Sequence, residues 1–409
     1  MKILMVNKFY YIKGGSETYY FALKRLLEKH GHKVIDFSMV DPRNYESPYS
    51  KYFVDNVDYE NACSITNKTR MAINIIYSFE AKKKFESLVL AEKPDIVHLH
   101  IFQHQISPSI LDVIKKYNIP TVYTAHDLKM VCPNYKMMHH GKICEKCKGG
   151  KYYHCAINKC VKNSFIKSCI NVVEGYLHKW RHSYSVIDQI ITPSLFYYRK
   201  FKEFGIDPER MVHIPNFLDT DKPVVSCRED KEKYYLYFGR LSEEKGVFTL
   251  LKAFSGLLEN LYIVGTGPIQ EEILQYITNH KLRNIYLLGY MSGQELKDIV
   301  GNAKAVILPS EWYENGPYSA IEALQLGIPI IGANIGGIPE LIDGNGFLFQ
   351  SGVAESLAIQ ILKVEKMPDQ QYKYLKLMSS RLYQNNYTAE NYYKKIEKIY
   401  EKARKGKCK

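Results

Sequence analysis

The sequence predicts an α/β protein with two doubly wound domains, each a parallel sheet covered by helices on both faces. Short β-branched runs alternate with longer stretches of helical periodicity, and this alternation starts again after a proline-containing segment. The 409 residues are enough for two domains with separate cores. We expect domains at 1–195 and 226–380, a connector at 196–225, and a C-terminal helix at 381–409 that packs back on the N-terminal domain.

The N-terminal half contains five runs typical of buried parallel strands. They are Lys2–Asn7, Lys33–Ser38, Asp95–His100, Thr121–Ala125 and Gln189–Thr192. Helical periodicity fills the intervals at 16–29, 68–91 and 106–117.

The second half repeats the pattern after a connector that contains Pro193, Pro208, Pro215 and Pro223. The expected strands are Tyr234–Phe238, Leu261–Val264, Asn284–Leu288, Ala305–Leu308 and Pro329–Ile331. Helical patterns follow at 246–258, 268–280, 292–301 and 318–326, and the chain from 353 onward has helical character.

The charge is concentrated in the N-terminal half. Residues 1–195 carry 28 Lys and Arg against 17 Asp and Glu, whereas residues 196–409 carry 28 against 26. Within 129–183 the numbers are 11 and 2. A basic surface on one domain indicates an anionic partner there, such as phospholipid headgroups, a pyrophosphate-linked acceptor or nucleic acid, although a solvated basic surface is the simpler alternative.

The apolar start of the chain ends at Asn7, so a strand fits it better than a secretory signal, and no apolar run approaches the length of a membrane helix. We therefore expect a cytoplasmic protein. Its basic charge also suggests peripheral contact with the inner face of the cell membrane.

Glycine-rich turns follow several of the expected strands. Gly14-Gly15 comes after the first strand, where Ser16 is placed to cap the next helix, and backbone N–H groups at such a helix start attract phosphate. Gly265 opens a similar turn in the second domain, and Gly336-Gly337 another. The pattern is not GxGxxG, so the dinucleotide fingerprint is absent. Each turn, taken alone, also fits an ordinary loop.

Two charged motifs follow strands of the second domain. Arg240 and Lys245 precede a helix and form a plausible clamp for a diphosphate. Glu314 ends a loop and Glu322 lies inside the next helix among apolar residues, where a carboxylate needs partners such as the hydroxyls of a ribose. Pro317 between them leaves neighbouring amides able to face an anion or a sugar.

Taken in order, these motifs resemble the family 4 glycosyltransferases, also called glycosyltransferase group 1. The resemblance covers most of the chain and is strongest over 234–345. It implies the GT-B fold, in which two Rossmann-like domains face a cleft, and a retaining reaction that needs no cofactor or catalytic divalent metal.

The resemblance also implies roles for single residues. Arg240 and Lys245 would hold the donor diphosphate, Glu322 the ribose, and Gly14 and Gly15 would reach the phosphates from the other domain. Contacts to the transferred sugar would come from Glu314 and from the amides of Asn315, Gly316, Pro317 and Tyr318. The turn that begins at Gly265 is placed, by its position after a strand, to lie against the nucleoside.

His126 and Asp127 follow the strand Thr121–Ala125 and would lie on the acceptor side, with His126 and Glu314 as the catalytic candidates. The alternative for His126 is a buried structural histidine whose ring nitrogens are hydrogen-bonded within the core. His98 and His100 alternate with apolar residues on their strand and fit a structural role equally well. No residue is a convincing nucleophile, so attack by Glu314 and a front-face reaction both stay open.

A lysine-rich insert at 130–170 carries four cysteines with a CxxC pair. They are Cys144, Cys147, Cys155 and Cys160. A structural zinc site, free thiols and disulfides are the three alternatives, and four thiolates suit tetrahedral zinc best. Residues 164–182, which begin within the insert and extend beyond it, mix apolar and basic side chains and fit either an interfacial helix or a core helix.

The leading hypothesis is a retaining hexosyltransferase that moves a sugar from a UDP- or GDP-sugar to a glycan or lipid-pyrophosphate acceptor, in surface polysaccharide or glycolipid synthesis. Within the same fold, a nucleotide-sugar epimerase or a sucrose-type synthase is the alternative. A zinc-containing nucleic-acid-binding protein is a third hypothesis, but it leaves two α/β domains without a purpose, so we expect no nucleic-acid partner.

Overall fold

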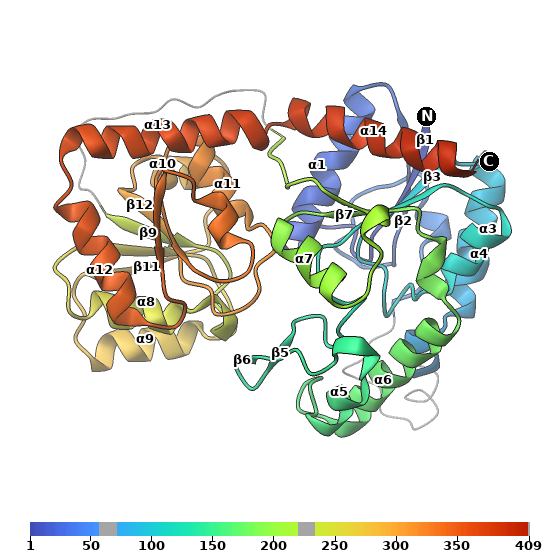
Figure 1. Cartoon of the computed structure of the whole chain (residues 1–409), viewed down its shortest axis with the longest axis horizontal. Coiled ribbons are helices and arrows are strands. Elements are labelled where there is room, and N and C mark those ends of the chain that lie inside the picture. Colours follow the sequence, from blue (N-terminus) through green and yellow to red (C-terminus); the bar gives the residue numbers. More distant parts are fainter. Residues whose placement is uncertain (57–71, 220–233, 408–409) are drawn as a thin grey trace. The chain divides into compact units, whose positions relative to one another are not determined.

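The computed structural model describes residues 1–56, 72–219 and 234–407, and they form two compact units. The first unit comprises Met1–His139, Cys144–Ile214 and Tyr392–Lys409. The second comprises His140–Ile143 and Pro215–Asn391. Figure 1 shows the chain by element, and each unit is described by itself.

The first unit is built on a six-stranded sheet in which every pairing is parallel. Its order is β2 (Lys33–Phe37), β1 (Lys2–Val6), β3 (Ile96–Leu99), β4 (Thr121–Thr124), β7 (Gln189–Thr192), β8 (Met211–His213). The central strands β3, β4 and β7 are buried along their whole length, because helices cover both faces of a parallel sheet. The order of the strands reverses between β1 and β3.

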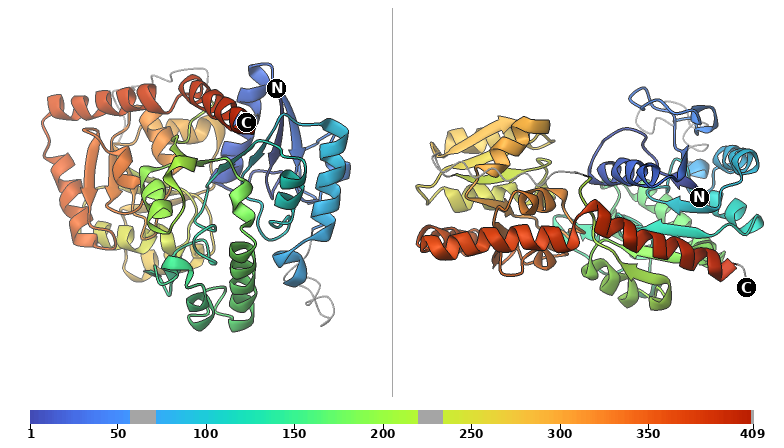
Figure 2. Two further views of the ribbon diagram at one scale, coloured as in Figure 1. Left: turned by 45° about the vertical axis from the view of Figure 1, so that its right-hand side comes forward. Right: turned by 90° about the horizontal axis from the view of Figure 1, so that it is seen from above.

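The helices of this unit lie between its strands and at the end of the chain. They are α1 (Gly15–Lys29), α3 (Phe79–Glu92), α4 (Ile110–Lys116), α5 (Tyr153–Ile157), α6 (Phe165–Trp180), α7 (Leu195–Glu203) and α14 (Ala389–Lys407). A short hairpin, β5 (Met138–His139) and β6 (Lys142–Ile143), lies in the insert. Figure 2 shows α14 (red) along the first unit, and there the Arg404 guanidinium donates to the Met1 sulfur.

The second unit repeats the architecture with a different strand order. Its parallel sheet runs β11 (Ile285–Gly289), β10 (Leu261–Val264), β9 (Tyr235–Phe238), β12 (Ala305–Leu308), β13 (Ile330–Ala333), β14 (Gly346–Phe349). The chain starts in the middle at β9, moves outward to β11, and then restarts at β12 on the other side of β9. The reversal therefore falls between β9 and β12.

Apolar residues of these strands and of the surrounding helices make one core in the second unit. The helices are α8 (Val247–Phe254), α9 (Gln270–Asn279), α10 (Gly293–Gly301), α11 (Tyr318–Gln325), α12 (Ala354–Glu365) and α13 (Asp369–Asn386). One side of α11 is buried in this core and determines which side of the helix faces outward. The buried side chains include Ala320, Ile321, Ala323 and Leu324.

The structure confirms the α/β fold class and the ten strands expected from the sequence, with ends that differ by at most two residues. Strands β8 and β14 and the two-residue strands β5 and β6 were missed, because each is a short run with weak β-branched signal. The chain passes from one unit to the other at Ile214 and Pro215, and the preceding residues form α7 and β8 of the first sheet. The expected helix at 68–91 falls partly outside the described residues, and its described part contains α3.

The expected cap of α1 is wrong. The cap position is Gly14, and no side chain caps the helix. The Ser16 hydroxyl instead donates to the Glu17 carboxylate at 2.9 Å. This leaves the first N–H groups of α1 without a side-chain acceptor.

The packing of β13 against β14 predicts a strict need for glycine at position 346. A methyl group there would lie 1.8 Å from the Ile330 carbonyl oxygen. We expect Gly346→Ala to lower the free energy of unfolding by about 2–3 kcal/mol, as overpacking does, measured by urea denaturation. Gly256→Ala is the matched control, since nothing lies within 4 Å of its added Cβ. Equal stability of the two variants would contradict this packing.

Candidate nucleotide-sugar site and acceptor-side residues

The candidate donor residues of the second unit lie where its strand order reverses. The Gly239–Gly246 segment follows β9 and the segment from Ser310 to Tyr318 follows β12. In open parallel sheets, ligands bind outside the carboxyl ends of the two strands that flank such a reversal. The Glu311 N–H donates to the Glu244 carbonyl at 2.9 Å, so the two loops are joined there.

Glycines allow the loops at this edge to pack backbone against backbone. A Cβ on Gly265 would lie 1.9 Å from the Gly239 carbonyl oxygen, and the φ of Gly265 is +133°. Gly336, with a φ of +61°, lies against the backbone of Glu314, and the Gly337 N–H donates to the Glu314 carbonyl at 2.7 Å. The glycines found in the sequence thus fix the positions of the loops around Glu314.

Glu314 is buried and ionised in a polar cluster. Its Oε1 accepts from the Lys245 ammonium at 2.6 Å and from the Ser310 hydroxyl at 2.7 Å. Burial by itself would raise the pKa of Glu314, but the Lys245 charge and these hydrogen bonds outweigh it and hold the pKa below its ordinary value. Ser310 was not among the site residues expected from the motifs.

Arg240 and the start of α11 are the other donor candidates that lie at this edge. The Arg240 side chain is exposed, and the Tyr237 hydroxyl donates to the Arg240 carbonyl at 2.8 Å, which fixes the backbone there. Helix α11 has Pro317 at its cap position and no side-chain cap. The Asn216 amide donates to the Gly316 carbonyl at 2.9 Å and so holds the loop before α11, the segment that includes Asn315 and continues to Tyr318.

Glu322 lies in the second turn of α11 and is half-buried. Desolvation by burial raises its pKa to about 7, and the Lys297 charge opposes this only in part. A carboxylate in this environment gains from any group that donates hydrogen bonds to it, and a ribose diol would supply two.

In the first unit, Gly14 and Gly15 stand at the start of α1, beside a buried pair that sequence reasoning missed. The Asn7 amide follows β1 and donates to the Phe9 carbonyl at 2.8 Å and to the Glu17 carboxylate at 3.4 Å. Burial raises the pKa of Glu17. The uncapped start of α1 therefore follows a polar segment that hydrogen bonds hold in place at the carboxyl end of β1.

His126 follows β4 and belongs to a row of three histidines. Its Nε2 lies 3.2 Å from Nδ1 of His100, and its ring packs edge-on against Tyr19. Burial lowers the pKa of His126 to about 3, so the ring is neutral at physiological pH. His98 is bonded on both nitrogens, to Tyr400 and to Thr124 at 2.8 Å each, and is thus a structural core histidine.

Asp127, the second acceptor-side candidate, lies among charges that the sequence did not single out. Its carboxylate accepts from the Lys129 backbone N–H at 2.9 Å, and burial raises its pKa. Burial and the nearby Lys13 charge lower the pKa of Lys8 to about 8, against the opposing fields of Glu17 and Asp127. Lys8 follows β1, next to the reversal of the first sheet, where a ligand is expected by the same rule.

The insert carries a cavity of about 520 Å³ in the first unit. Lys129 and Glu174 line it and form a buried ion pair at 2.7 Å. The second oxygen of Glu174 has no hydrogen-bond partner among the described residues.

The zinc site predicted at Cys144, Cys147, Cys155 and Cys160 is not supported. Within 1–56, 72–219 and 234–407 no group of three or more His, Cys, Asp or Glu side chains could hold a metal ion. The thiols of Cys155 and Cys160 hydrogen-bond each other, and Cys144 accepts instead from the Asn158 amide at 4.0 Å. All six cysteines of the described part are free.

Comparison with known proteins places these features in a family. Residues 13–222 match "Glycosyltransferase Family 4" and residues 220–401 match "Glycosyl transferases group 1". The chain belongs to the family 4 glycosyltransferases. The resemblance seen in the sequence motifs is thereby confirmed at the level of the family.

Individual relatives of this glycosyltransferase are distant. An uncharacterized glycosyltransferase of Methanocaldococcus jannaschii is 24% identical over 89% of this chain and 88% of its own length. An uncharacterized protein of the Klebsiella pneumoniae cps region is 22% identical over 83% and 87%. A second M. jannaschii glycosyltransferase is 33% identical, but the match spans 28% of this chain and 30% of that protein.

Solved structures support the GT-B architecture. Anabaena HepE in complex with UDP superposes with a TM-score of 0.69 at 17% sequence identity, and the match covers 98% of this chain and 99% of that one. At this identity the likeness concerns the fold, which is two Rossmann-like units of the GT-B kind.

The raised pKa of Glu322 predicts a pH-dependent cost in stability. Because the pKa rises from 4.5 in the unfolded chain to about 7, the cost is absent below about pH 4.5 and complete above about pH 7. Glu322→Gln should therefore raise the melting temperature at pH 8 by about 2–4 °C, and the gain should shrink toward pH 5 in a thermal-melt series. The exposed Glu355→Gln serves as control, with no such trend. If Glu322→Gln were less stable than wild type at pH 8, the raised pKa of Glu322 would be contradicted.

Proposed function

We propose that this glycosyltransferase is a retaining hexosyltransferase that uses a UDP- or GDP-sugar and acts on a glycan or lipid-pyrophosphate acceptor. Surface polysaccharide or glycolipid synthesis is the process that we infer. The observation that carries the proposal is the cluster at the strand reversal of the second unit, where Lys245 pairs with Glu314 and Arg240 is exposed beside them in sequence.

The diphosphate of the donor would be held by Arg240 and Lys245. The guanidinium is exposed, and the Lys245 ammonium uses one described hydrogen bond on Glu314, so further N–H donors remain to it for phosphate oxygens. The uncapped start of α11 adds N–H groups and a favourable dipole near the developing negative charge. These groups would stabilise the leaving diphosphate, and Gly14 and Gly15 at the start of α1 are inferred to add phosphate contacts.

The ribose is assigned to Glu322. Its carboxylate lies on the same helix whose start would face the transferred sugar, and ionisation of Glu322 gains from hydroxyl donors. Gly265, in the turn after β10, would border the nucleoside.

Names of similar proteins favour a uridine nucleotide and a surface glycan. The HepE structures hold UDP and UDP-glucose, and a pneumococcal O-GlcNAc transferase of similar fold holds UDP with GlcNAc. Among the relatives, one is encoded in a cps region and another is named for amylovoran biosynthesis. These names support the proposed donor and process.

The acceptor is assigned to the first unit. His126 is neutral and can exchange hydrogen bonds with a hydroxyl without carrying charge, and Asp127 and Lys8 are polar groups of the same unit. A phosphate-bearing acceptor fits the excess of Lys and Arg over residues 129–183. We infer a cytoplasmic enzyme that meets its acceptor at the inner face of the membrane.

The ionisation of Glu314 restricts its role in the reaction. A carboxyl group with a lowered pKa is deprotonated at neutral pH, so it cannot act as a general acid. It can stabilise positive charge at the anomeric carbon. Because Lys245 and Ser310 both donate to Oε1 of Glu314, we favour a front-face reaction in which the leaving phosphate takes the acceptor proton, over a covalent intermediate on Glu314.

The donor assignment predicts a selective loss on substitution of Arg240. We expect one nucleotide family among UDP-, GDP-, ADP- and TDP-sugars to raise the melting temperature, as a ligand of the folded state does. In Arg240→Ala this shift should vanish and kcat/KM for donor hydrolysis should fall about 10²–10³-fold, the scale for one preorganised charge contact.

Arg283→Ala is the matched control. Arg283 is exposed and precedes β11, so it lies at the amino ends of the strands of the same sheet, whereas Arg240 lies at their carboxyl ends. A folded wild-type protein that responds to none of the nucleotide sugars would overturn the proposal. So would an equal loss in both arginine variants.

Retention can be tested without knowing the acceptor. When the enzyme hydrolyses an α-linked nucleotide sugar, the first sugar released should be the α anomer, followed by slow mutarotation, and time-resolved proton NMR distinguishes the two anomers. Release of the β anomer first would exclude a retaining reaction. Glu314→Gln should still release the α anomer at a reduced rate if the reaction is front-face.

A further inference from the structure

Helix α6 has its polar side turned inward and its apolar side turned to solvent. The side chains of Ser168, Asn171, Glu174 and His178 are at most 5% exposed. Large apolar side chains lie on the opposite side, with exposed fractions of 55% for Phe165, 73% for Ile166, 53% for Val173, 39% for Tyr176 and 79% for Trp180. A surface helix of a soluble domain has the reverse arrangement.

Specific contacts hold the polar side of α6 in place. The Glu174 carboxylate pairs with buried Lys129 at 2.7 Å, and the Asn171 amide donates to the Pro133 carbonyl at 3.3 Å. His178 is bonded at both ring nitrogens, to the Ile76 carbonyl at 2.8 Å and to the Ser183 hydroxyl at 2.9 Å. Turning the helix about its axis would break all of these bonds and leave buried charges unpaired.

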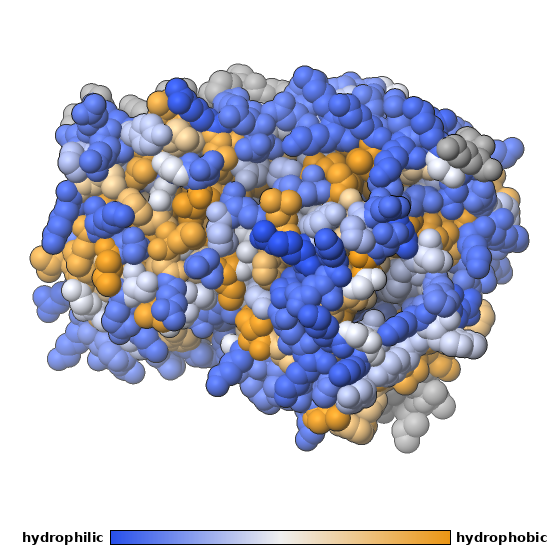
Figure 3. All heavy atoms as spheres, viewed as in Figure 1, coloured by the Kyte–Doolittle hydropathy of each residue, from blue (hydrophilic) through white to orange (hydrophobic). Residues whose placement is uncertain are grey.

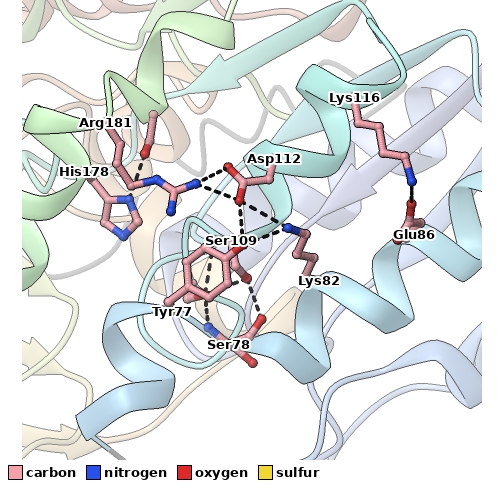
Figure 4. Close-up of polar contacts among 11 residues, drawn as sticks. Tyr77, Ser78, Lys82, Glu86, Ser109, Asp112, Lys116, His178 and Arg181 are labelled. Carbon is pink, nitrogen blue, oxygen red and sulfur yellow. Dashed lines mark hydrogen bonds and ion pairs between the residues drawn. The ribbon is translucent and has the colours of Figure 1, made fainter.

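The end of α6 is tied to the body of the first unit as well. Figure 4 shows the Arg181 guanidinium directed at the Asp112 carboxylate, where the contact is 2.9 Å, with Tyr77 bonded to the same carboxylate. The helix is thus fixed at its end and along its inner side, and the outward apolar side is a stable feature of the fold.

The charge around this apolar stripe is positive. Residues 146–187 contain eight Lys and Arg residues and one acidic residue, the buried Glu174. Lys151, Lys167 and Lys179 are exposed. In Figure 3, orange apolar groups are visible at the lower end of the molecule near α5 and α6, among blue hydrophilic ones. Exposed Tyr153 and Ile157 of α5 add to the apolar surface of the insert.

We propose that the outward side of α6 is a docking surface for an anionic lipid bilayer, on which the helix lies parallel to the membrane plane. Aromatic and aliphatic side chains would enter the boundary between headgroups and acyl chains, and the flanking lysines would contact the anionic headgroups. In the described part of the chain no helix is long and apolar enough to cross a bilayer. A protein partner or a second copy of the chain would need acidic groups opposite these lysines, and the same stripe displays none.

This docking surface extends the membrane contact inferred under the proposed function. It contains no candidate donor-binding residue, so loss of vesicle binding and loss of donor binding can be told apart. The test is flotation of the full chain with vesicles of phosphatidylcholine alone and of phosphatidylcholine with phosphatidylglycerol. We expect binding to the anionic vesicles, little binding to the neutral ones, and weakening by high salt.

Two variants separate the apolar and electrostatic parts of this contact. Ile166→Ser with Trp180→Ser should weaken binding to anionic vesicles about thirtyfold or more, and Lys151→Gln with Lys167→Gln about tenfold. All four side chains are exposed, so the fold is preserved. Leu258→Ser with Ile359→Ser, also exposed, is the control and should bind as wild type does.

Trp180 gives a direct signal. Its fluorescence should shift to shorter wavelength on anionic vesicles, and the shift should vanish in Trp180→Phe. Absence of binding by the folded chain would overturn the proposal, as would binding that the Ile166 and Trp180 substitutions leave unchanged. A concentration-dependent dimer that those substitutions abolish would assign the stripe to a second copy instead.

Discussion

The reversal of strand order between β9 and β12 is the constraint on which the candidate site in the second unit of this glycosyltransferase depends. Because helices leave these two neighbouring strands toward opposite faces of the sheet, the loops that follow them are left without a helix between them. Lys245 from one loop and Glu314 from the other meet there at 2.6 Å. The glycines at 265 and 336 permit the close backbone packing that keeps these loops in position.

The two glutamates of the motif show how environment gives one residue type two different pKa values. Both are withdrawn from solvent, but Glu314 has a cation and a hydroxyl within hydrogen-bond distance, and its pKa is lowered. Glu322 has only a weaker influence from Lys297, and its pKa is raised to about 7. This difference in pKa is the physical basis on which different roles are proposed for the two carboxyl groups.

The first unit has the same parallel-sheet architecture but a different arrangement of polar groups. Its polar residues at the ends of β1 and β4 are largely bonded to one another, as the histidine row and the Asn7–Glu17 contact show. The insert adds α6, whose buried ion pair stabilises a helix that turns apolar side chains outward. The contrast between the internal polar contacts and the apolar, basic exterior distinguishes this unit from the second.

The sequence alone determined the strands, the two repeats of the α/β pattern and the glycine and charged motifs after particular strands, because period-2 and period-3.6 patterns and turn residues are local signals. It could not give the partners of those motifs. Ser310 and Lys8 were not among the expected site residues. Ser310 is four residues from Glu314, so the conformation of one loop decides that contact, whereas Asn216 and Gly316 are 100 residues apart and the tertiary fold brings them together. The four-cysteine spacing suggested a metal site, but spacing does not determine the direction of the thiol groups. In the described fold the thiols of Cys155 and Cys160 form a hydrogen bond with each other. The sequence also left open which side of α6 is buried, because an amphipathic pattern shows only that the helix has a polar and an apolar side. Contacts with Lys129, Pro133 and Ile76 decide that the polar side is the buried one.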